Sequence, residues 1–313
     1  MIRYVLRRLG TGVVLAVLVT MITFLLLSTS FDSVVASILG PAATPDLVDA
    51  LKADMGLTRP VLVQYVDWLL GAIQGDFGVS YFTSEPVGHA VAARLGVTLS
   101  IVVVALVLTV LLSVVLGVLA ASRGGVVDRL AQGATLVGHI VPGLLIAIVL
   151  VFVLAITLRL LPATGFTPIS DDPARWAATI TIPVIVLVIG GLANLAAQVR
   201  GTMIDELRKD YVRTLRSRGI SARSVVYRHA LRNAAGPALT TLSFEFLAML
   251  GGALVIENVF ALPGFGSYAF NASIQGDVPI IMGITLFSVL LVVSINLVVD
   301  LVNGWLNPKA RIL

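Results

Sequence analysis

The stretch GVTLSIVVVALVLTVLLSVVLGVLAA at residues 96–121 contains no charged residue and no proline. A run of about 18 or more mostly apolar residues is long enough to cross the hydrocarbon core of a bilayer as a helix. Working outward from this run, which we extend to residues 95–121, five others have the same character. They cover about residues 9–29, 135–161, 177–199, 238–256 and 280–302. The sequence therefore predicts an all-α polytopic membrane protein with six transmembrane helices.

The composition agrees with this class of protein. Of the 313 residues, 58% are hydrophobic and 12% are charged, and the mean hydropathy is +1.02. These values lie far from those of soluble globular domains. The chain has no cysteine and three histidines, at positions 89, 139 and 229, so neither a disulfide nor a zinc site of the Cys/His or HExxH type can form.

The distribution of Lys and Arg predicts the orientation of the spans. Alternate connections between six spans fall on opposite sides of the membrane, and one side holds 16 of the 21 basic residues. Because Lys and Arg accumulate in cytoplasmic connections, we expect both termini in the cytoplasm. The basic side comprises the N-terminus, residues 122–134, residues 200–236 and the C-terminal tail.

The N-terminal part leaves one alternative open. A basic start followed by an apolar run fits both a membrane anchor and a cleaved signal peptide; a length of about 21 residues and the lack of a clear A-x-A site favour the anchor. The segment at about 30–94 is the only long polar one, and it predicts a small extracytoplasmic subdomain between spans 1 and 2. Its GDFG sequence at 75–78 predicts a turn.

A basic island interrupts the apolar chain at residues 210–237, which read DYVRTLRSRGISARSVVYRHALRNAAGP and include six arginines. The pattern predicts two short helices separated by Gly219. This glycine suits the left-handed residue that ends a helix, and Ser221 suits the N-cap of a second helix ending near Asn233. The island is therefore expected to form a helix, turn, helix unit.

The charges of the island fit this arrangement. Asp205 and Glu206 suit the start of the first helix, and Arg216 and Arg218 its end, because they complement the helix dipole. Charge alone leaves two interpretations open, a long positive-inside connection or a unit that docks on another protein. Nucleic-acid binding is not supported, because the island has only two aromatic residues and no nucleic-acid-binding fold accompanies it.

The residues themselves, rather than their charge, resemble a known family. The island resembles the EAA loop of binding-protein-dependent ABC importers, in the form found in B-type permease subunits of the dipeptide, oligopeptide and nickel family. There the pattern is roughly DYVRTARAKGLS, followed by RHALRNALIP. Three further blocks match in order: MGLTRPVLVQYVDWL at 55–69, GDFGVSY at 75–81 and GGALVIENVFALPGFG at 251–266. The matching island positions are Asp210, Tyr211, Val212, Arg213, Thr214, Gly219, Ser221, Arg228, His229, Ala230, Leu231, Arg232, Asn233 and Pro237.

This resemblance extends over essentially the whole chain and implies the type I ABC importer permease fold in the cytoplasmic (inner) membrane. It divides the chain into two parts. Residues 1–94 are the N-terminal transmembrane helix with the extracytoplasmic subdomain. Residues 95–313 are a permease core of five transmembrane helices that contains the cytoplasmic coupling loop 200–236.

The resemblance also implies the function and the partners. The chain would form half of the translocation pathway for di- or oligopeptides, or alternatively for nickel chelates, glutathione or opines. Its partners would be a second homologous permease subunit, two ABC ATPase subunits that bind ATP and Mg²⁺, and an extracytoplasmic substrate-binding protein. As a transport subunit, the chain itself would bind no cofactor and would be no enzyme. It is not expected to be the ATPase, since no lysine follows a glycine and a GxxxxGK[ST] phosphate loop cannot be written.

The resemblance assigns two groups of site residues. The glycine turn and its helices would couple the permease to the ATPase. Residues of the fifth span and the loop after it would line the pathway or form a gate, although a plain capped turn fits that loop equally well. The coupling residues are Tyr211, Arg213, Gly219, Ser221, Arg228, His229 and Arg232. The pathway residues are Glu245, Glu257, Asn258, Pro263 and Gly264.

Glu245 stands where the family has a Gln-like residue, and its role stays open. A carboxylate inside a span either lines the route of a cationic substrate or hydrogen-bonds to a neighbouring helix. For His139, the other ionisable residue well inside a span, we expect a structural role. A channel or secondary transporter would be expected to have several ion-coupling carboxylates in its spans, and an intramembrane enzyme would need a catalytic pair; the sequence shows neither.

Overall fold

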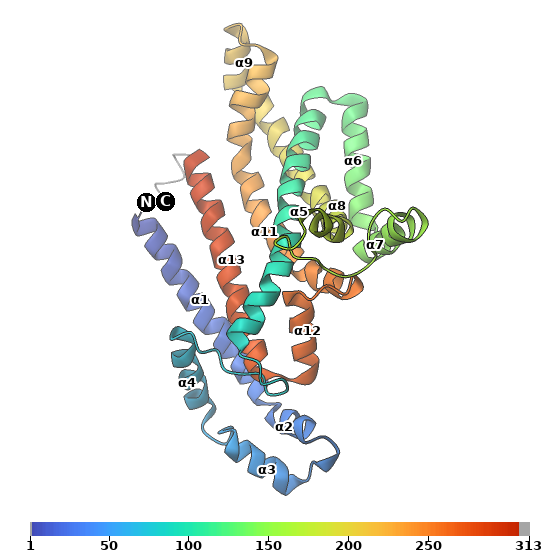
Figure 1. Cartoon of the computed structure of the whole chain (residues 1–313). Coiled ribbons are helices and arrows are strands. Elements are labelled where there is room, and N and C mark those ends of the chain that lie inside the picture. Colours follow the sequence, from blue (N-terminus) through green and yellow to red (C-terminus); the bar gives the residue numbers. More distant parts are fainter. Residues whose placement is uncertain (1, 307–313) are drawn as a thin grey trace. The chain divides into compact units, whose positions relative to one another are not determined.

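The computed structural model describes residues 2–306, which form helices joined by turns and short loops (Figure 1). In this range no β-strand forms, apart from a single isolated bridge between Val79 and Pro86. The expected all-α class is confirmed. Five helical segments are long and apolar enough to cross a membrane: Tyr4–Ser28, Val87–Arg123, Pro173–Arg208, Ala222–Val259 and Val278–Trp305.

The predicted third span differs from the straight helix that was expected at 135–161. It consists of two helical segments, Gly125–Ile140 and Gly143–Thr157, bent by 97°. The break lies at Val141, which is extended (φ −82°, ψ 118°). Pro142 explains this, because a proline disfavours the helical conformation of the residue before it and has no N–H to donate. Counted as one bent span, the pair brings the number of candidate spans to six.

The helices group into two compact units. The first unit comprises the chain up to Val97 together with Pro263–Ser294, and the second comprises Thr98–Leu262 together with the chain from Ile295 onward. Two long helices, α5 (Val87–Arg123) and α13 (Val278–Leu306), run from one unit into the other. The division of the chain at residues 94 and 95, which was inferred from the family resemblance, stays a prediction.

The first unit contains two clusters of buried hydrophobic side chains. Its core contains the aromatic rings of Phe24, Phe31 and Tyr65, and the Phe24 centroid lies 6.1 Å from that of Phe31 and 5.9 Å from that of Tyr65. A second cluster joins α5, α12 and α13 through Val91, Phe265 and other buried side chains. Besides parts of α5 and α13, the unit contains α1 (Ile2–Ser28), α2 (Phe31–Leu39), η1 (Gly40–Ala42), α3 (Pro45–Asp54), α4 (Val61–Ile73) and α12 (Phe265–Gln275).

The second unit contains the remaining helices. α8 packs against both α6 and α11. A Cβ on Gly117 of α5 would lie 2.7 Å from the Val199 side chain of α8, so glycine is needed where these two helices meet. The helices are α6 (Gly125–Ile140), α7 (Gly143–Leu150), the π-helical η2 (Val151–Thr157), α8 (Pro173–Arg208), α9 (Asp210–Ser217), α10 (Ala222–Ser224), the π-helical η3 (Val225–Ala230) and α11 (Leu231–Val259).

Candidate functional site

The basic island forms a helix, turn, helix unit at the end of α8 and α11, where Figure 1 draws α9. Gly219 has φ +75°, the left-handed conformation that was expected. Its N–H donates to the Arg216 carbonyl (3.0 Å), and the Ile220 N–H donates to the Leu215 carbonyl (3.2 Å). These two bonds define a Schellman motif, which satisfies the last carbonyls of α9. The Ser221 side chain then caps the next helix by accepting from the Ser224 N–H (3.4 Å).

Tyr211 fastens α9 to the two long helices on either side of it. Its hydroxyl donates to Glu206 Oε2 of α8 (2.9 Å) and accepts from Asn233 Nδ2 of α11 (3.2 Å). Glu206 is buried and also accepts from the Lys209 ammonium. Burial raises the pKa of the Tyr211 phenol, and the hydrogen bond to Glu206 acts in the same direction. Together with the buried side chain of Val212, these contacts fix the inner side of α9.

The outer side of the unit is exposed and basic. Arg213 lies 3.6 Å from Asp210, and both side chains are almost fully exposed, so this pair contributes little. Within residues 2–306 the other arginines of the island have no ion pair. Gly219 stands in open space, since no atom lies within 4 Å of a Cβ built on it. The exposed residues of this surface are Arg213, Arg216, Arg218, Gly219, Ser221, Arg223, Arg228 and Arg232, and His229 is half-buried.

Two details of the island differ from expectation. Asp205 and Glu206 were expected at the start of the first helix, but they lie in the last turn of α8, and Asp210 occupies the first turn of α9. The second helix was expected to end near Asn233. It instead continues through η3 into α11, so that the segment Ala222–Val259 is one apolar helix. The turn is therefore joined rigidly to a membrane helix.

A second polar group lies among the helices of the second unit. His139 Nε2 lies 2.6 Å from Asn194 Oδ1, and His139 Nδ1 lies 2.8 Å from the Thr135 carbonyl. Asn194 also hydrogen-bonds to Glu245, whose side chain is buried. This chain of contacts links α6, α8 and α11. Of the two roles left open for Glu245, the hydrogen bond to a neighbouring helix is the one that the geometry supports.

The hydrogen bonds restrict the protonation of this group. A carbonyl oxygen accepts, so His139 Nδ1 must donate to Thr135. In one arrangement a doubly protonated His139 donates to Asn194 Oδ1, and the Asn194 amide donates to an ionised Glu245. In the other, the Asn194 amide is reversed, His139 is neutral and Glu245 is protonated. A neutral His139 therefore requires a protonated Glu245, whereas a doubly protonated His139 is compatible with either form of Glu245, because a protonated carboxyl group still has an oxygen that accepts from the Asn194 amide.

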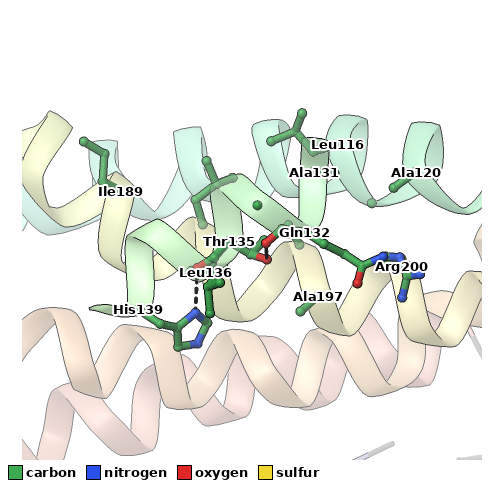
Figure 2. A pocket seen from close by; sticks show the side chains of 15 residues that line it. Leu116, Ala120, Ala131, Gln132, Thr135, Leu136, His139, Ile189, Ala197 and Arg200 are labelled. Carbon is green, nitrogen blue, oxygen red and sulfur yellow. Dashed lines mark hydrogen bonds between the residues drawn. The ribbon is translucent and has the colours of Figure 1, made fainter. Parts of the chain in front are cut away.

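A cavity of about 630 Å³ lies between α5, α6 and α8 (Figure 2). His139 and Arg200 lie toward opposite ends of it in this view. Arg200 Nη2 donates to Asp128 Oδ2 (2.7 Å), so its charge is neutralised by a residue of α6. Small and aliphatic side chains such as Ala120, Ala197 and Ile189 form most of the wall. No pattern in the sequence indicates this cavity, because it depends on how three helices are spaced.

The expected pathway residues do not form one group. Glu257 lies in α11, is fully buried and accepts from the Thr98 hydroxyl of α5. It follows Glu245 by twelve residues, roughly 18 Å along the helix. Asn258 donates to the Leu254 carbonyl of its own helix (2.8 Å). Glu257 and Asn258 were expected outside the fifth span, but α11 extends to Val259 and includes both. Pro263 is exposed, and Gly264 is buried at the start of α12.

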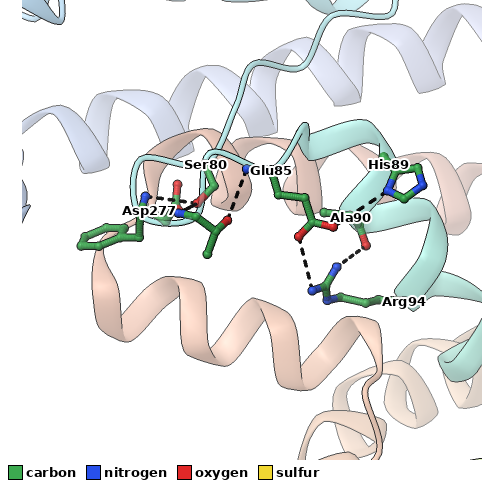
Figure 3. A network of polar contacts seen from close by, with 8 residues as sticks. Ser80, Glu85, His89, Ala90, Arg94 and Asp277 are labelled. Carbon is green, nitrogen blue, oxygen red and sulfur yellow. Dashed lines mark hydrogen bonds and ion pairs between the residues drawn. The ribbon is translucent and has the colours of Figure 1, made fainter.

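A polar network in the first unit was not expected from the sequence (Figure 3). Asp277, which is 3% exposed, accepts from the Ser80 hydroxyl (2.5 Å) and from the Tyr81 N–H (3.3 Å). Burial raises the pKa of Tyr81 to about 12, and the nearby Asp277 carboxylate adds to this shift. The Gly-Asp-Val-Pro sequence at 276–279 suggests a helix start, and nothing in it indicates a bond to residue 80.

Arg94 extends this network. Its guanidinium lies 3.9 Å from the ring centroid of Tyr268 and donates to the Ala90 carbonyl (2.9 Å) and to Glu85 Oε2 (3.5 Å). The turn expected at GDFG is confirmed, since Gly75 and Gly78 have positive φ and Asp76 Oδ1 accepts from the Gly78 N–H (2.9 Å). The connection before α5 is therefore held in place by hydrogen bonds to other residues of the first unit.

The family models match almost the entire chain. Residues 113–312 match the binding-protein-dependent transport system inner membrane component, and residues 1–102 match the N-terminal part of such membrane components. The chain belongs to this family and is a multi-pass membrane permease subunit of an ABC importer.

Relatives of full length agree with this assignment. The chain is 37% identical to a probable peptide ABC transporter permease protein of Sinorhizobium fredii, over 98% of this chain and 99% of that protein. It is 34% identical to a putative peptide transport system permease protein of Brucella abortus, over 98% of both. It is 31% identical to the metal-staphylopine import system permease protein CntB of Staphylococcus aureus, over 99% of both. The resemblance found in the sequence is confirmed.

Proposed function

We propose that this chain is one of two permease subunits of an importer for di- or oligopeptides, paired with a different but homologous permease. An extracytoplasmic binding protein delivers the substrate, and two ATPase subunits bind and hydrolyse ATP with Mg²⁺. The chain itself performs no catalysis. Support comes from relatives whose names include peptide transport and which align with this chain from end to end.

In this proposal the unit formed by α9, Gly219 and α10 transmits ATPase movement to the membrane helices. The supporting observation is the contrast between its two sides: Tyr211 and Val212 fasten the inner side, while exposed arginines and an open turn face outward. A short rigid helix with exposed donors suits a groove on another protein. Because Ala222–Val259 is one helix, a push on the turn would reach the membrane directly. Arg213, Ser221, Arg228, His229 and Arg232 contribute to the same contact, with Gly219 setting the turn.

We further propose six spans, with the bent pair α6 and α7 to η2 as the third, and with both termini in the cytoplasm. Residues 30–94 then lie at the extracytoplasmic side as the insertion between spans 1 and 2. The excess of Lys and Arg on the side that includes the basic island supports this orientation. The location that we propose is the cytoplasmic (inner) membrane, which the description of the matching family as an inner membrane component supports.

For the pathway we propose an indirect role of Glu245. Its carboxylate holds Asn194, which in turn contacts His139 at the wall of the cavity. Glu257 would tie α11 to α5 through Thr98. The proposed gate is the end of α11 and the connection to α12, which contain Asn258, Pro263 and Gly264. A gate at this place would need a turn that can change its conformation.

A crosslinking experiment tests the ATPase contact. The chain has no cysteine, so Arg218→Cys gives a single reactive site on the exposed turn. In native membranes a short bifunctional reagent should join it to a P-loop ATPase, identified by mass spectrometry. Leu160→Cys, an exposed position in the connection after η2, is the matched control and should give no such product. Failure of Arg218→Cys to capture an ATPase, or equal capture from both sites, would remove the proposed coupling role.

A second substrate class follows from one relative. The Staphylococcus aureus permease is named for metal-staphylopine import, so this chain could serve a transporter of metal chelates. Uptake of a labelled tripeptide and of a nickel chelate by cells with and without this chain separates the two. The proposal predicts that only peptide uptake depends on the chain; dependence of nickel uptake alone would select the second class.

A further inference from the structure

The helix α4 exposes an apolar stripe. Leu62, Val66, Leu70 and Ile73 are 61%, 49%, 54% and 75% exposed. Their spacing of four, four and three residues places them on one side of the helix. Tyr65, on the other side, is buried in the core of the first unit. A stripe of four large aliphatic side chains is unfavourable in water, so it requires a covering.

The neighbouring helix α3 shows that a stripe of exposed aliphatic side chains is not a general property of the helices in this subdomain. α3 has no buried residue, and its exposed side chains include Asp46, Asp49 and Asp54. Thr44 caps it by accepting from the Leu47 N–H (3.4 Å). α3 is therefore suited to water, whereas α4 is not.

The contacts of Tyr65 fix the level of α4 along the first membrane helix. Its hydroxyl donates to the Val17 carbonyl (2.9 Å) and lies 3.0 Å from the Thr20 hydroxyl. Val17 lies eleven residues before Ser28, the end of α1, which corresponds to roughly 16 Å at 1.5 Å per residue. The hydrocarbon core is about 30 Å thick, so the Tyr65 hydroxyl lies level with the membrane-spanning part of α1 rather than beyond its end. Figure 1 likewise draws α4 beside the C-terminal half of α1.

The character of the stripe distinguishes lipid from protein as its covering. The stripe is purely aliphatic, while the centres of protein interfaces are enriched in aromatic residues and arginine. α1 beside it exposes the same kind of surface, for example at Leu18 and Ile22, and 22% of its most apolar window is buried. Both helices, which contact each other, thus expose aliphatic side chains. The charge of Asp67, also on α4, is balanced by Arg59 at 2.6 Å.

We propose that α4 is an interfacial membrane helix whose stripe Leu62, Val66, Leu70 and Ile73 contacts lipid in the leaflet at the C-terminal end of α1. Helices of this kind lie with the apolar side immersed in the boundary between headgroups and acyl chains. The segment at 30–94, expected to be aqueous, then contains both a helix in water, α3, and a helix in lipid, α4. This proposal requires only that α1 crosses the membrane, so it is independent of the proposed substrate and of the ATPase contact.

Nitroxide labels test the proposal in the complete transporter reconstituted in phospholipid nanodiscs. Single cysteines are introduced by Val66→Cys and Leu70→Cys, with Ala50→Cys on α3 as the water control and Val13→Cys on α1 as the lipid control. Collision with oxygen, which concentrates in lipid, is compared with collision with a water-soluble nickel chelate. The ratio of oxygen to nickel accessibility at Val66 and Leu70 should be several-fold higher than at Ala50 and close to that at Val13.

Two results would overturn the proposal. A ratio at Val66 and Leu70 equal to that at Ala50 would place α4 in water. Protection from both reagents would mean that another protein, such as the second permease, covers the stripe. All four positions are exposed or half-exposed, so the label displaces no core side chain. Leu62→Cys lies on the same stripe and replaces either variant that fails to assemble.

Discussion

Two segments outside the core of the membrane helices are built in opposite ways. In the first unit, Ser80 donates to Asp277 and Arg94 donates to Glu85 (Figure 3). The Arg94 guanidinium also lies over the ring of Tyr268, and we call these five residues the closed network. In the second unit, residues 209–221 form what we call the open turn. Its arginines face solvent, and its glycine has no neighbour that a side chain would meet.

The sequences of the two regions are constrained for different reasons. The closed network is fixed by the fold of the chain itself, because a buried carboxylate without its donors costs free energy. The open turn makes few contacts beyond those of Tyr211 and Val212, so its arginine-rich sequence is not explained by the stability of this chain. Changes in the closed network should therefore lower stability, and changes in the open turn should lower transport.

The largest effect is expected for Gly219→Val. A β-branched residue is strained at φ +75°, so the turn should change its conformation even though space for the side chain is available. We expect peptide uptake to fall by at least about tenfold, the equivalent of 1.4 kcal/mol or more in coupling. Membrane insertion, measured by the amount of purified protein, should stay unchanged.

Gly40→Val is the matched control for this change. Gly40 also has a positive φ, +58°, and no atom lies within 4 Å of a Cβ built on it. It ends α2 in the first unit, far along the chain from the open turn. Equal loss of uptake in both variants would show that backbone strain alone, rather than the coupling contact, is responsible. The open turn would then have no special role in transport.

The next largest effect is expected for Asp277→Ala. This change leaves the Ser80 hydroxyl and the Tyr81 N–H without their acceptor in a buried environment. Two unsatisfied donors should cost roughly 2–4 kcal/mol of stability. The thermal unfolding midpoint of the purified complex should fall, and uptake per folded molecule should remain near that of the unaltered protein.

A double-mutant cycle sharpens this prediction. Ser80→Ala and Asp277→Ala are measured singly and together, and the coupling between them should be of order 1 kcal/mol, because the two residues share one hydrogen bond. If the losses of stability in the two single variants simply added up in the double variant, the hydrogen bond would contribute nothing to stability. The closed network would then not be held together by this bond.

The two regions also differ in how well they could be predicted. The positive φ of Gly219 and the cap at Ser221 are local properties, set by residues near in sequence, and both predictions are confirmed. The bond between Ser80 and Asp277 joins residues 197 positions apart. No periodicity or propensity contains that information, since it depends on how α5, α12 and α13 pack.

The membrane helices show the same limit. Their approximate positions follow from apolar runs, which the bilayer requires to be helical. Their ends do not, because a helix continues beyond the hydrocarbon core wherever the next residues permit. Glu257 was expected in a loop for this reason and lies within α11. The bend at Val141 was missed although Pro142 marks it, because the apolar pattern continues on both sides.

A smaller effect is expected for Tyr211→Phe. The change removes one hydroxyl that bridges Glu206 and Asn233 and keeps the ring. Glu206 retains its contact with Lys209, so the loss of stability should be about 1 kcal/mol. Uptake should fall several-fold, since α9 is less firmly held. Tyr227→Phe, at an exposed position of η3, should leave uptake unchanged; an equal loss there would mean that the bridging hydroxyl is not what matters.

The smallest effects come from a pair of arginines, one in each region. Arg94→Ala removes a guanidinium stacked on Tyr268 and two hydrogen bonds, and should cost about 1 kcal/mol of stability. Arg213→Ala removes a weak contact between two exposed groups and should leave the unfolding midpoint unchanged. The effects on uptake should be reversed: uptake should fall more with Arg213→Ala than with Arg94→Ala. If Arg213→Ala lowered the midpoint as much as Arg94→Ala, the open turn would be stabilised by its own charges, and the need for a partner to explain them would disappear.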